Sequence, residues 1–174
     1  MRSCLAGLAL LISVAPAAIA GPEDFSPGTV ITGYGEFAPV TDTRLGTGSV
    51  FHVAYDVSAV GPADAVNRAF VTPARFLNMH ANAGVLPENM HLAVVVHGGA
   101  YKDLLTDEAR GSENPNTELI AKLIDAGVTF ELCGQTAGYN DVAQQDLLPG
   151  VEISLSAMTS HALLQQQGYT LNPF

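Results

Sequence analysis

One nearly unbroken apolar run, from Met90 to His97, restricts the fold of this chain more than any other feature. Its centre reads Leu92-Ala93-Val94-Val95-Val96, five apolar residues between His91 and His97. Such a run is typical of a strand buried on both faces of a parallel sheet, because helices cover both faces of these sheets. Parallel neighbours also need long crossover connections, which are usually helices. The run therefore predicts an α/β domain.

Shorter segments around this run alternate between strand and helix patterns. We expect further strands from Ser49 to about Asp56, from Val128 to Leu132 and from Val151 to Leu155, where β-branched and apolar residues cluster. Helical patterns between them predict helices over residues 64–83, 114–126, 136–147 and 156–167. This alternation predicts a flavodoxin-like, doubly wound α/β domain, with a mainly parallel sheet and helices on both faces.

Local capping signals refine two of these helices. Asp64 fits the cap of a short first turn, whereas Thr72-Pro73 fit the N-cap and first position of a second piece. The helix after the first strand is therefore expected in two pieces. Ser156 is expected to cap the last helix.

Residues 1–20 have the layout of a secretory signal peptide. A single basic residue, Arg2, precedes an uncharged apolar run over residues 5–15 and the small-residue triplet Ala18-Ile19-Ala20. The run is too short to cross a bilayer as a helix, so no stable membrane insertion is expected. The sequence predicts an exported protein, in a bacterial periplasm, with an arm rich in Gly, Pro and Thr over residues 21–48 and a domain over residues 49–174.

The net charge excludes one class of partner. The formal charge of the whole chain is −10, and removal of Arg2 with the signal peptide makes it one unit more negative. Nucleic-acid binding depends on the opposite sign, because Lys and Arg must neutralise phosphates. We therefore expect no nucleic-acid partner.

Removal of residues 1–20 would leave Cys133 as the only cysteine. Unpaired cysteines are uncommon in oxidising compartments and need a reason. One reading is a reactive thiol, and the other is a small buried hydrophobic residue. Composition alone does not decide between these two readings.

Four residues fall at or just after the ends of predicted strands: Asp56, His97, Cys133 and Ser156. The carboxyl ends of parallel strands share one edge, where ligands of open α/β sheets bind. Cys133 is followed by Gly134-Gln135-Thr136 and a predicted helix, so its sulfur is expected beside free backbone N–H groups. Such surroundings lower the pKa of a thiol and favour the nucleophilic thiolate. Gly134 would leave room for a ligand. The other candidate binding residues at this edge are Gly98, Gly99, Gln135, Thr136 and Ser156.

His97 has two open readings. It could serve Cys133 as a base or counter-ion, or its ring could pack at the strand end and bond a loop carbonyl. His97-Gly98-Gly99 also resembles the oxyanion strand of esterases, but the chain has no Gly-x-Ser-x-Gly turn for a nucleophile. An esterase is therefore not expected.

The sequence indicates no metal and no cofactor. The five histidines lack the close ligand spacings of zinc sites. The chain also contains no Gly-x-Gly-x-x-Gly and no phosphate-loop motif, which argues against a dinucleotide or ATP enzyme.

Three stretches of the chain resemble the exported branch of the DsrE/DsrF-like (DsrEFH) family of sulfur-relay proteins. They are Ala74-Arg75-Phe76-Leu77-Asn78-Met79-His80 with Ala93-Val94-Val95-Val96-His97-Gly98-Gly99-Ala100; Asn114-Pro115-Asn116-Thr117-Glu118-Leu119 with Cys133-Gly134-Gln135-Thr136-Ala137; and Leu155-Ser156-Ala157-Met158-Thr159 with Gln165-Gln166-Gln167-Gly168-Tyr169. The similarity extends over about residues 49–174. Cys-Gly-Gln at a strand end is its most specific motif.

The resemblance implies a flavodoxin-like fold, small homo-oligomers and a cysteine that carries sulfur as a persulfide. Cys133 matches that cysteine, with small reduced sulfur species or a partner protein thiol as the implied partners. Two features depart from the family pattern: Asn140-Asp141 stand where relay members often have a basic residue and glycine, and Pro73 falls inside a helix that is usually continuous. The rival reading is a non-enzymatic oligomeric scaffold in which Cys133 is inert.

Overall fold

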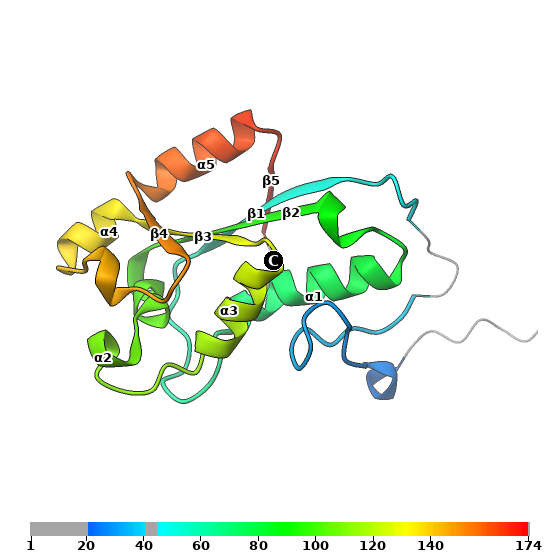
Figure 1. The fold of residues 1–174 in the computed structure, drawn as a ribbon, viewed down its shortest axis with the longest axis horizontal. Helices are drawn as coiled ribbons and strands as arrows, with labels where there is room; N and C mark the ends of the chain where they lie inside the picture. The colour runs from blue at the N-terminus through cyan, green and yellow to red at the C-terminus, as the bar shows by residue number, and fades with distance from the viewer. Residues whose placement is uncertain (1–20, 41–44, 174) are drawn as a thin grey trace, which may run out of the picture.

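A parallel sheet of five strands forms the centre of the molecule, in the order β4-β3-β2-β1-β5 (Figure 1). The structure is a computed structural model that describes residues 21–40 and 45–173, so the predicted signal peptide lies outside the described residues. The strands are β1 (Phe51–Val57), β2 (Met90–Val96), β3 (Thr129–Cys133), β4 (Val151–Ser154) and β5 (Thr170–Asn172). Every neighbouring pair is parallel.

Helices cover both faces of this sheet (Figure 1). The helices α1 (Arg68–Asn82) and α3 (Thr117–Asp125) pack together on one face, whereas α5 (Ala157–Gln166) lies on the other. The remaining helical segments are α2 (Asp107–Arg110), α4 (Gly134–Tyr139) and the 3₁₀ turns η1 (Pro22–Asp24), η2 (Pro87–Asn89), η3 (Gly98–Leu104) and η4 (Gln144–Asp146). The predicted doubly wound α/β fold is confirmed.

The two faces of the sheet bury very different amounts of apolar surface. The side of α1 and α3 holds the main core, which includes Phe70, Leu119 and Phe130. On the opposite side Leu164 of α5 contacts a small cluster with Ala93 and Val95. Burial of a large apolar side chain contributes about 1.5–3 kcal/mol. Because fewer apolar side chains are buried under α5, apolar packing stabilises its position less than that of α1 or α3. Among the described helices, none has the length and hydrophobicity needed to span a bilayer.

The helix after β1 is continuous, so its prediction in two pieces was wrong. Asn67, rather than Asp64, caps it by accepting a hydrogen bond from the N–H of Ala69. Pro73 lies inside the helix and is buried. A proline there removes one backbone hydrogen bond, and the burial of neighbouring residues such as Phe70 and Leu77 offsets this cost.

The helix after β3 is also different from its prediction over residues 136–147. It begins at Gly134 and ends after six residues at Tyr139. Asp141 has a left-handed backbone with φ 54°, which no α-helix can continue through. Three elements were not predicted from the sequence: η3, α2 and β5. A 3₁₀ turn, a single helical turn and a strand of three residues are too short to show a periodic pattern.

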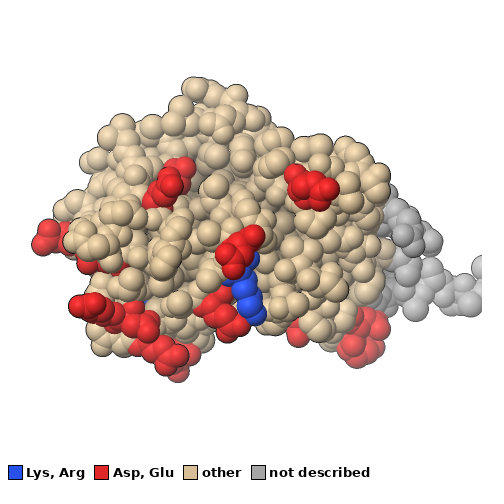
Figure 2. All heavy atoms as spheres, viewed as in Figure 1, with Lys and Arg blue, Asp and Glu red and all other residues tan. Residues whose placement is uncertain are grey.

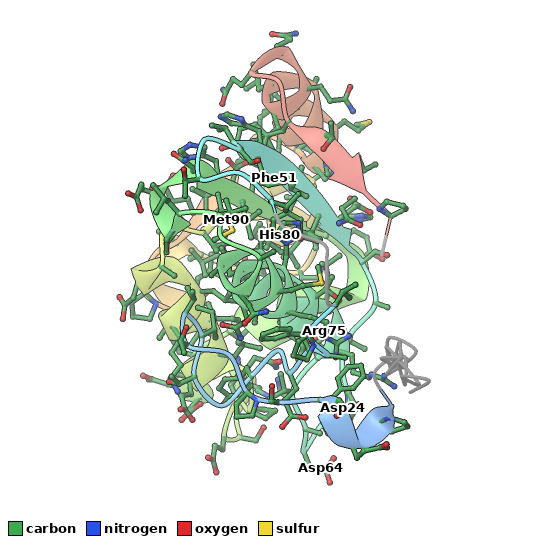
Figure 3. The ribbon with its side chains drawn as sticks, turned by 90° about the vertical axis from the view of Figure 1, so that its right-hand side faces the viewer. Asp24, Phe51, Asp64, Arg75, His80 and Met90 are labelled. Atoms are coloured by element: carbon green, nitrogen blue, oxygen red, sulfur yellow. The ribbon has the colours of Figure 1, made fainter. Side chains whose placement is uncertain are left out.

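The N-terminal arm packs against the helical layer through Asn78 of α1. The side-chain amide of Asn78 donates to the carbonyls of Ile31 and Tyr34, and its oxygen accepts from the N–H groups of Val30 and Ile31. Ile31 is fully buried as a result. Arg75 donates a hydrogen bond to the carbonyl of Glu36 in the same arm, on the side of α1 seen in Figure 3. The described part of the arm therefore extends the core.

An aromatic contact joins the amino end of β1 to the last turns of α1. Phe51 pairs with Met90 in the sheet register, and the ring of Phe51 lies edge-on to His80, with centroids 4.8 Å apart (Figure 3). Burial lowers the pKa of His80, which also hydrogen-bonds the carbonyl of Phe76. The opposite, carboxyl end of the sheet carries the polar residues singled out from the sequence.

Candidate active site

Cys133 is the last residue of β3 and the N-cap of α4. It lies beside Ser154, the last residue of the neighbouring strand β4. The helix after β3, α4, contributes Ala137 to the main core on the side of α1 and α3. The chain after β4 leads instead to α5 on the other face (Figure 1). The carboxyl ends of β3 and β4 therefore form a topological switch point, where open α/β sheets bind ligands.

Polar groups from two separate segments lie around the sulfur of Cys133. The backbone N–H group of Ala157, at the start of α5, and those of Thr136 and Gln135, in the first turn of α4, all lower the pKa of this thiol. None of the α4 groups makes a regular helix-cap hydrogen bond to the Cys133 side chain, so they act on the thiolate as nearby N–H donors. The side chain of Thr136 is a further donor. Burial raises the pKa of the Cys133 thiol, but these donors outweigh it, so the pKa lies below its ordinary value. The site favours the thiolate.

Ser156 explains why the N–H of Ala157 is free to reach the sulfur. As predicted, Ser156 caps α5, and its hydroxyl accepts from the N–H of Thr159 at 3.1 Å. The first N–H groups of a helix have no partner within the helix. The N–H of Ala157 is one of these groups, so it can donate to Cys133. Ser156 thus acts on the site by fixing where α5 begins.

Gly134 has a different role from the one expected. A Cβ at this position would lie 2.3 Å from the carbonyl oxygen of Ser154 and 3.0 Å from that of Leu155. The space beside Gly134 is therefore filled by the connection between β4 and α5 rather than open to a ligand. This close approach brings the start of α5 next to Cys133.

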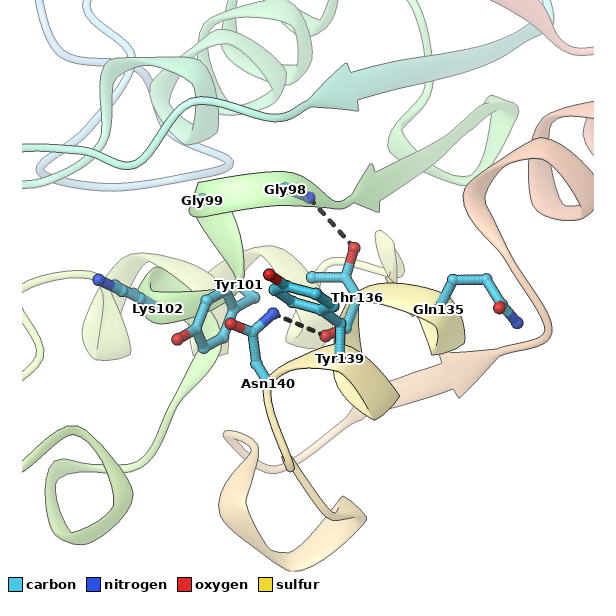
Figure 4. Close-up of a pocket in the computed structure, with 8 residues that line it drawn as sticks. All are labelled: Gly98, Gly99, Tyr101, Lys102, Gln135, Thr136, Tyr139 and Asn140. Atoms are coloured by element: carbon cyan, nitrogen blue, oxygen red, sulfur yellow. Dashed lines mark hydrogen bonds between the residues drawn. The ribbon is translucent and has the colours of Figure 1, made fainter.

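Thr136 connects the sulfur to the loop after β2. The N–H of Gly98 donates to the Thr136 hydroxyl at 3.2 Å, so that oxygen is used as an acceptor on one side (Figure 4). Its own proton remains available for Cys133. Gly98 has a left-handed backbone with φ 53°, a conformation that glycine adopts without strain.

Replacement of Thr136 by valine is expected to raise the pKa of Cys133, because the hydroxyl donor is lost while the shape is kept. A hydrogen bond to a charged group contributes about 1.5–3 kcal/mol, and water would replace part of it. We expect the alkylation rate of Cys133 near neutral pH to fall roughly three- to tenfold. The matched control, Thr136→Ser, keeps the hydroxyl and is expected to react like the parent. Equal rates for the valine and serine variants would contradict the assignment.

His97 contacts Asp56, a partner that neither interpretation of the sequence predicted. Its Nε2 lies 3.1 Å from Oδ2 of Asp56, whose Oδ1 is 2.7 Å from Nε2 of His161 on α5. Burial raises the pKa of Asp56, but the two histidines outweigh this effect and lower it. The donors that lower the pKa of Cys133 do not include His97. A role for His97 in catalysis therefore stays a prediction.

The same contact helps to hold α5 against the sheet. His161 binds Asp56 of β1, and Ser160 donates a hydrogen bond to Glu131 of β3. These polar contacts supplement the small apolar cluster under α5. Ser160 and His161 were not predicted from the sequence, because no local pattern links them to partners more than twenty positions earlier in the chain.

Four of the predicted binding residues line one pocket, between η3 and α4 (Figure 4). They are Gly98, Gly99, Gln135 and Thr136. Cys133 is not among the lining residues and is only 6% exposed. No group of three or more potential metal ligands occurs among residues 21–40 and 45–173.

The fold and the site together define a class: a doubly wound α/β protein with one cysteine thiol at the switch point of its sheet. Residues 50–173 match the DsrE/DsrF-like family. The chain therefore belongs to the DsrE/DsrF-like family, whose general role is sulfur relay.

Two solved structures share the fold. MTH1491 from Methanobacterium thermoautotrophicum, a protein of unknown function, is 20% identical with a TM-score of 0.55, over 70% of this chain and 97% of its own. The ychN protein from E. coli is 13% identical with a TM-score of 0.53, over 71% of this chain and 100% of its own. A search of curated proteins found no match. At these identities the two structures support the fold alone.

Proposed function

We propose that this protein is an exported sulfur carrier that holds one sulfur atom on Cys133 as a persulfide. The observation that carries this proposal is the position of Cys133 at the N-cap of α4 and beside the end of β4, where N–H groups of α4 and α5 lower the pKa of its thiol. Hydrogen bonds to an anion are stronger than those to a neutral group. They stabilise the thiolate before the reaction, and the thiolate is the nucleophile in thiol chemistry.

The proposed loading step is an attack of the Cys133 thiolate on the protonated terminal sulfur of a polysulfide. A bond forms between Cys133 and the attacked sulfur, and the S–S bond behind that sulfur breaks. The electron pair of the broken bond leaves with the shortened polysulfide. The product is a persulfide on Cys133, with no net oxidant or reductant consumed.

The unloading step has the same form. The thiolate of an acceptor attacks the outer sulfur of the persulfide, and the Cys133 thiolate leaves. Because Cys133 would be the only cysteine after export, no second thiol within the chain can resolve the persulfide. The acceptor must therefore be another molecule, either a small thiol or a partner protein thiol.

Intact mass measurement tests this proposal. The reduced protein is incubated with sodium polysulfide and weighed beside Cys133→Ser. We expect the parent to gain the mass of one sulfur atom, which a reducing agent removes, and the serine variant to gain nothing. A gain in both variants would place the sulfur elsewhere.

One observation favours a second candidate function. Cys133 is 6% exposed, as an inert cysteine in a non-enzymatic scaffold would be. The scaffold reading predicts no mass gain in either variant, so the same experiment separates the two. The expected assembly into small homo-oligomers fits both candidates and stays a prediction.

Export is a separate part of the proposal and has its own test. The layout of residues 1–20 supports it. We expect protein recovered from the periplasmic fraction of a bacterial host to begin at Gly21. An intact Met1 in a cytoplasmic fraction would count against export and would leave the sulfur chemistry untouched.

A further inference from the structure

The pocket between η3 and α4 has a volume of about 550 Å³. Sites for small molecules span about 300–1,000 Å³, so a compound larger than an inorganic sulfur anion fits here. Figure 4 shows Lys102 toward one end of the pocket, Gln135 toward the other, and Tyr101 and Tyr139 between them. The two tyrosines offer an organic ligand apolar contact with polar hydroxyl ends.

The pocket touches the turn of backbone that holds the Cys133 sulfur. Gln135 and Thr136 line the pocket, directly follow the α4 N-cap Cys133 and Gly134 in the chain, and lower the pKa of the Cys133 thiol. Gly98, at the pocket wall, fixes the Thr136 hydroxyl. A ligand in the pocket would therefore lie against the turn that stabilises the thiolate.

Lys102 gives the pocket a local positive charge in a strongly acidic protein. The chain carries 17 Asp and Glu against 7 Lys and Arg, and acidic groups are spread over the face shown in Figure 2. Within the described residues Arg110 and Lys122 have carboxylate partners, but the ammonium of Lys102 has none. Such an unpaired cation can bind an anionic group of a ligand.

We propose that this pocket binds a small organic thiol, or its persulfide, that carries a carboxylate. The carboxylate pairs with Lys102, the organic body lies along Tyr101 and Tyr139, and the sulfur faces the first turn of α4. This inference rests on the proposed function and names its substrate class. With a persulfide as ligand, the Cys133 thiolate bonds to the outer sulfur, and the ligand leaves as a thiolate.

Binding is tested apart from the chemistry, in the Cys133→Ser variant with S-methylglutathione as an unreactive probe. Amide chemical shifts are followed by NMR while the probe is added. We expect the shifts to change at Gly98, Gly99 and Asn140, which line the pocket. Lys102→Gln in the same background is expected to weaken binding about two- to fivefold, the range of an exposed ion pair.

Two controls isolate the carboxylate contact. Arg68→Gln removes the same charge from an exposed residue outside this pocket and is expected to leave the affinity unchanged. The dimethyl ester of S-methylglutathione lacks the carboxylates and is expected to bind more weakly than the acid. General attraction to an acidic protein would have the opposite effect, because the ester is cationic.

Each failure has a distinct meaning. No shift changes at these glycines, equal affinity for acid and ester, or equal weakening by Lys102→Gln and Arg68→Gln would overturn the ligand assignment. Sulfur uptake from polysulfide by the parent would then still support the carrier. Conversely, probe binding without any uptake would leave the pocket assignment standing and refute the carrier.

Discussion

Replacement of Gly134 by alanine is expected to destabilise the protein by about 1–3 kcal/mol and to raise the pKa of Cys133, because the added methyl group overpacks the site. The new Cβ would lie 2.3 Å from the carbonyl oxygen of Ser154. Backbone on both sides of this contact must move apart. The movement shifts the start of α5, so the N–H of Ala157 is withdrawn from the sulfur.

Gly138 provides a matched control within the same helix. Nothing lies within 4 Å of a Cβ built there, and the residue is exposed. Alanine is a better helix former than glycine by about 1 kcal/mol, so Gly138→Ala is expected to stabilise the protein slightly and leave the thiol unchanged. Urea unfolding and the pH dependence of alkylation measure both effects. If Gly134→Ala had the same stability and the same thiol pKa as Gly138→Ala, the close approach of β4 to α4 would not be needed to keep the pKa of Cys133 low.

Loss of the Asp103 carboxylate is expected to cost about 3–5 kcal/mol, because it would leave a mostly buried positive charge without its partner. Asp103 is completely buried in η3, and its Oδ2 accepts from Gly61 N–H at 2.7 Å and from the Asn67 amide at 2.8 Å. Its Oδ1 accepts no hydrogen bond and lies 3.5 Å from Nη1 of Arg110. This carboxylate joins the loop after β1, the start of α1 and α2.

The Asp103→Ala variant is compared with Asp64→Ala, which removes a carboxylate from an exposed position (Figure 3). A surface change of this kind is expected to alter the free energy of unfolding by less than about 0.5 kcal/mol. Denaturant unfolding of both variants gives the comparison. If the two variants had similar free energies of unfolding, the hydrogen bonds and ion pair of Asp103 would do no more than offset the cost of burying its carboxylate.

Most of the sheet could be predicted from the sequence, because each long strand carries its own pattern. The apolar run at Met90 gave β2 within one residue, and β3 and β4 were also found within one residue at each end. The three residues of β5 carry no such pattern. Pro73 misled the prediction of α1, since local propensity favours a helix start there while tertiary burial of the residues around it supports a continuous helix.

The candidate site was predictable only where it depends on local sequence. Cys133 at a strand end before a helix is a local feature, and so are its donors Gln135 and Thr136. The third backbone donor, Ala157, reaches the sulfur because β3 and β4 are neighbours, and strand order is not written in any local pattern. The pairing of His97 with Asp56 likewise depends on the adjacency of β1 and β2.

The central claim is that amides from two helices hold one sulfur in its anionic form at the end of β3. Titration of the Cys133 thiolate by its ultraviolet absorbance, with Cys133→Ser as the blank, tests this directly. The account predicts a midpoint below the ordinary thiol value. A midpoint at or above that value would show that burial outweighs the amides, and would contradict the account.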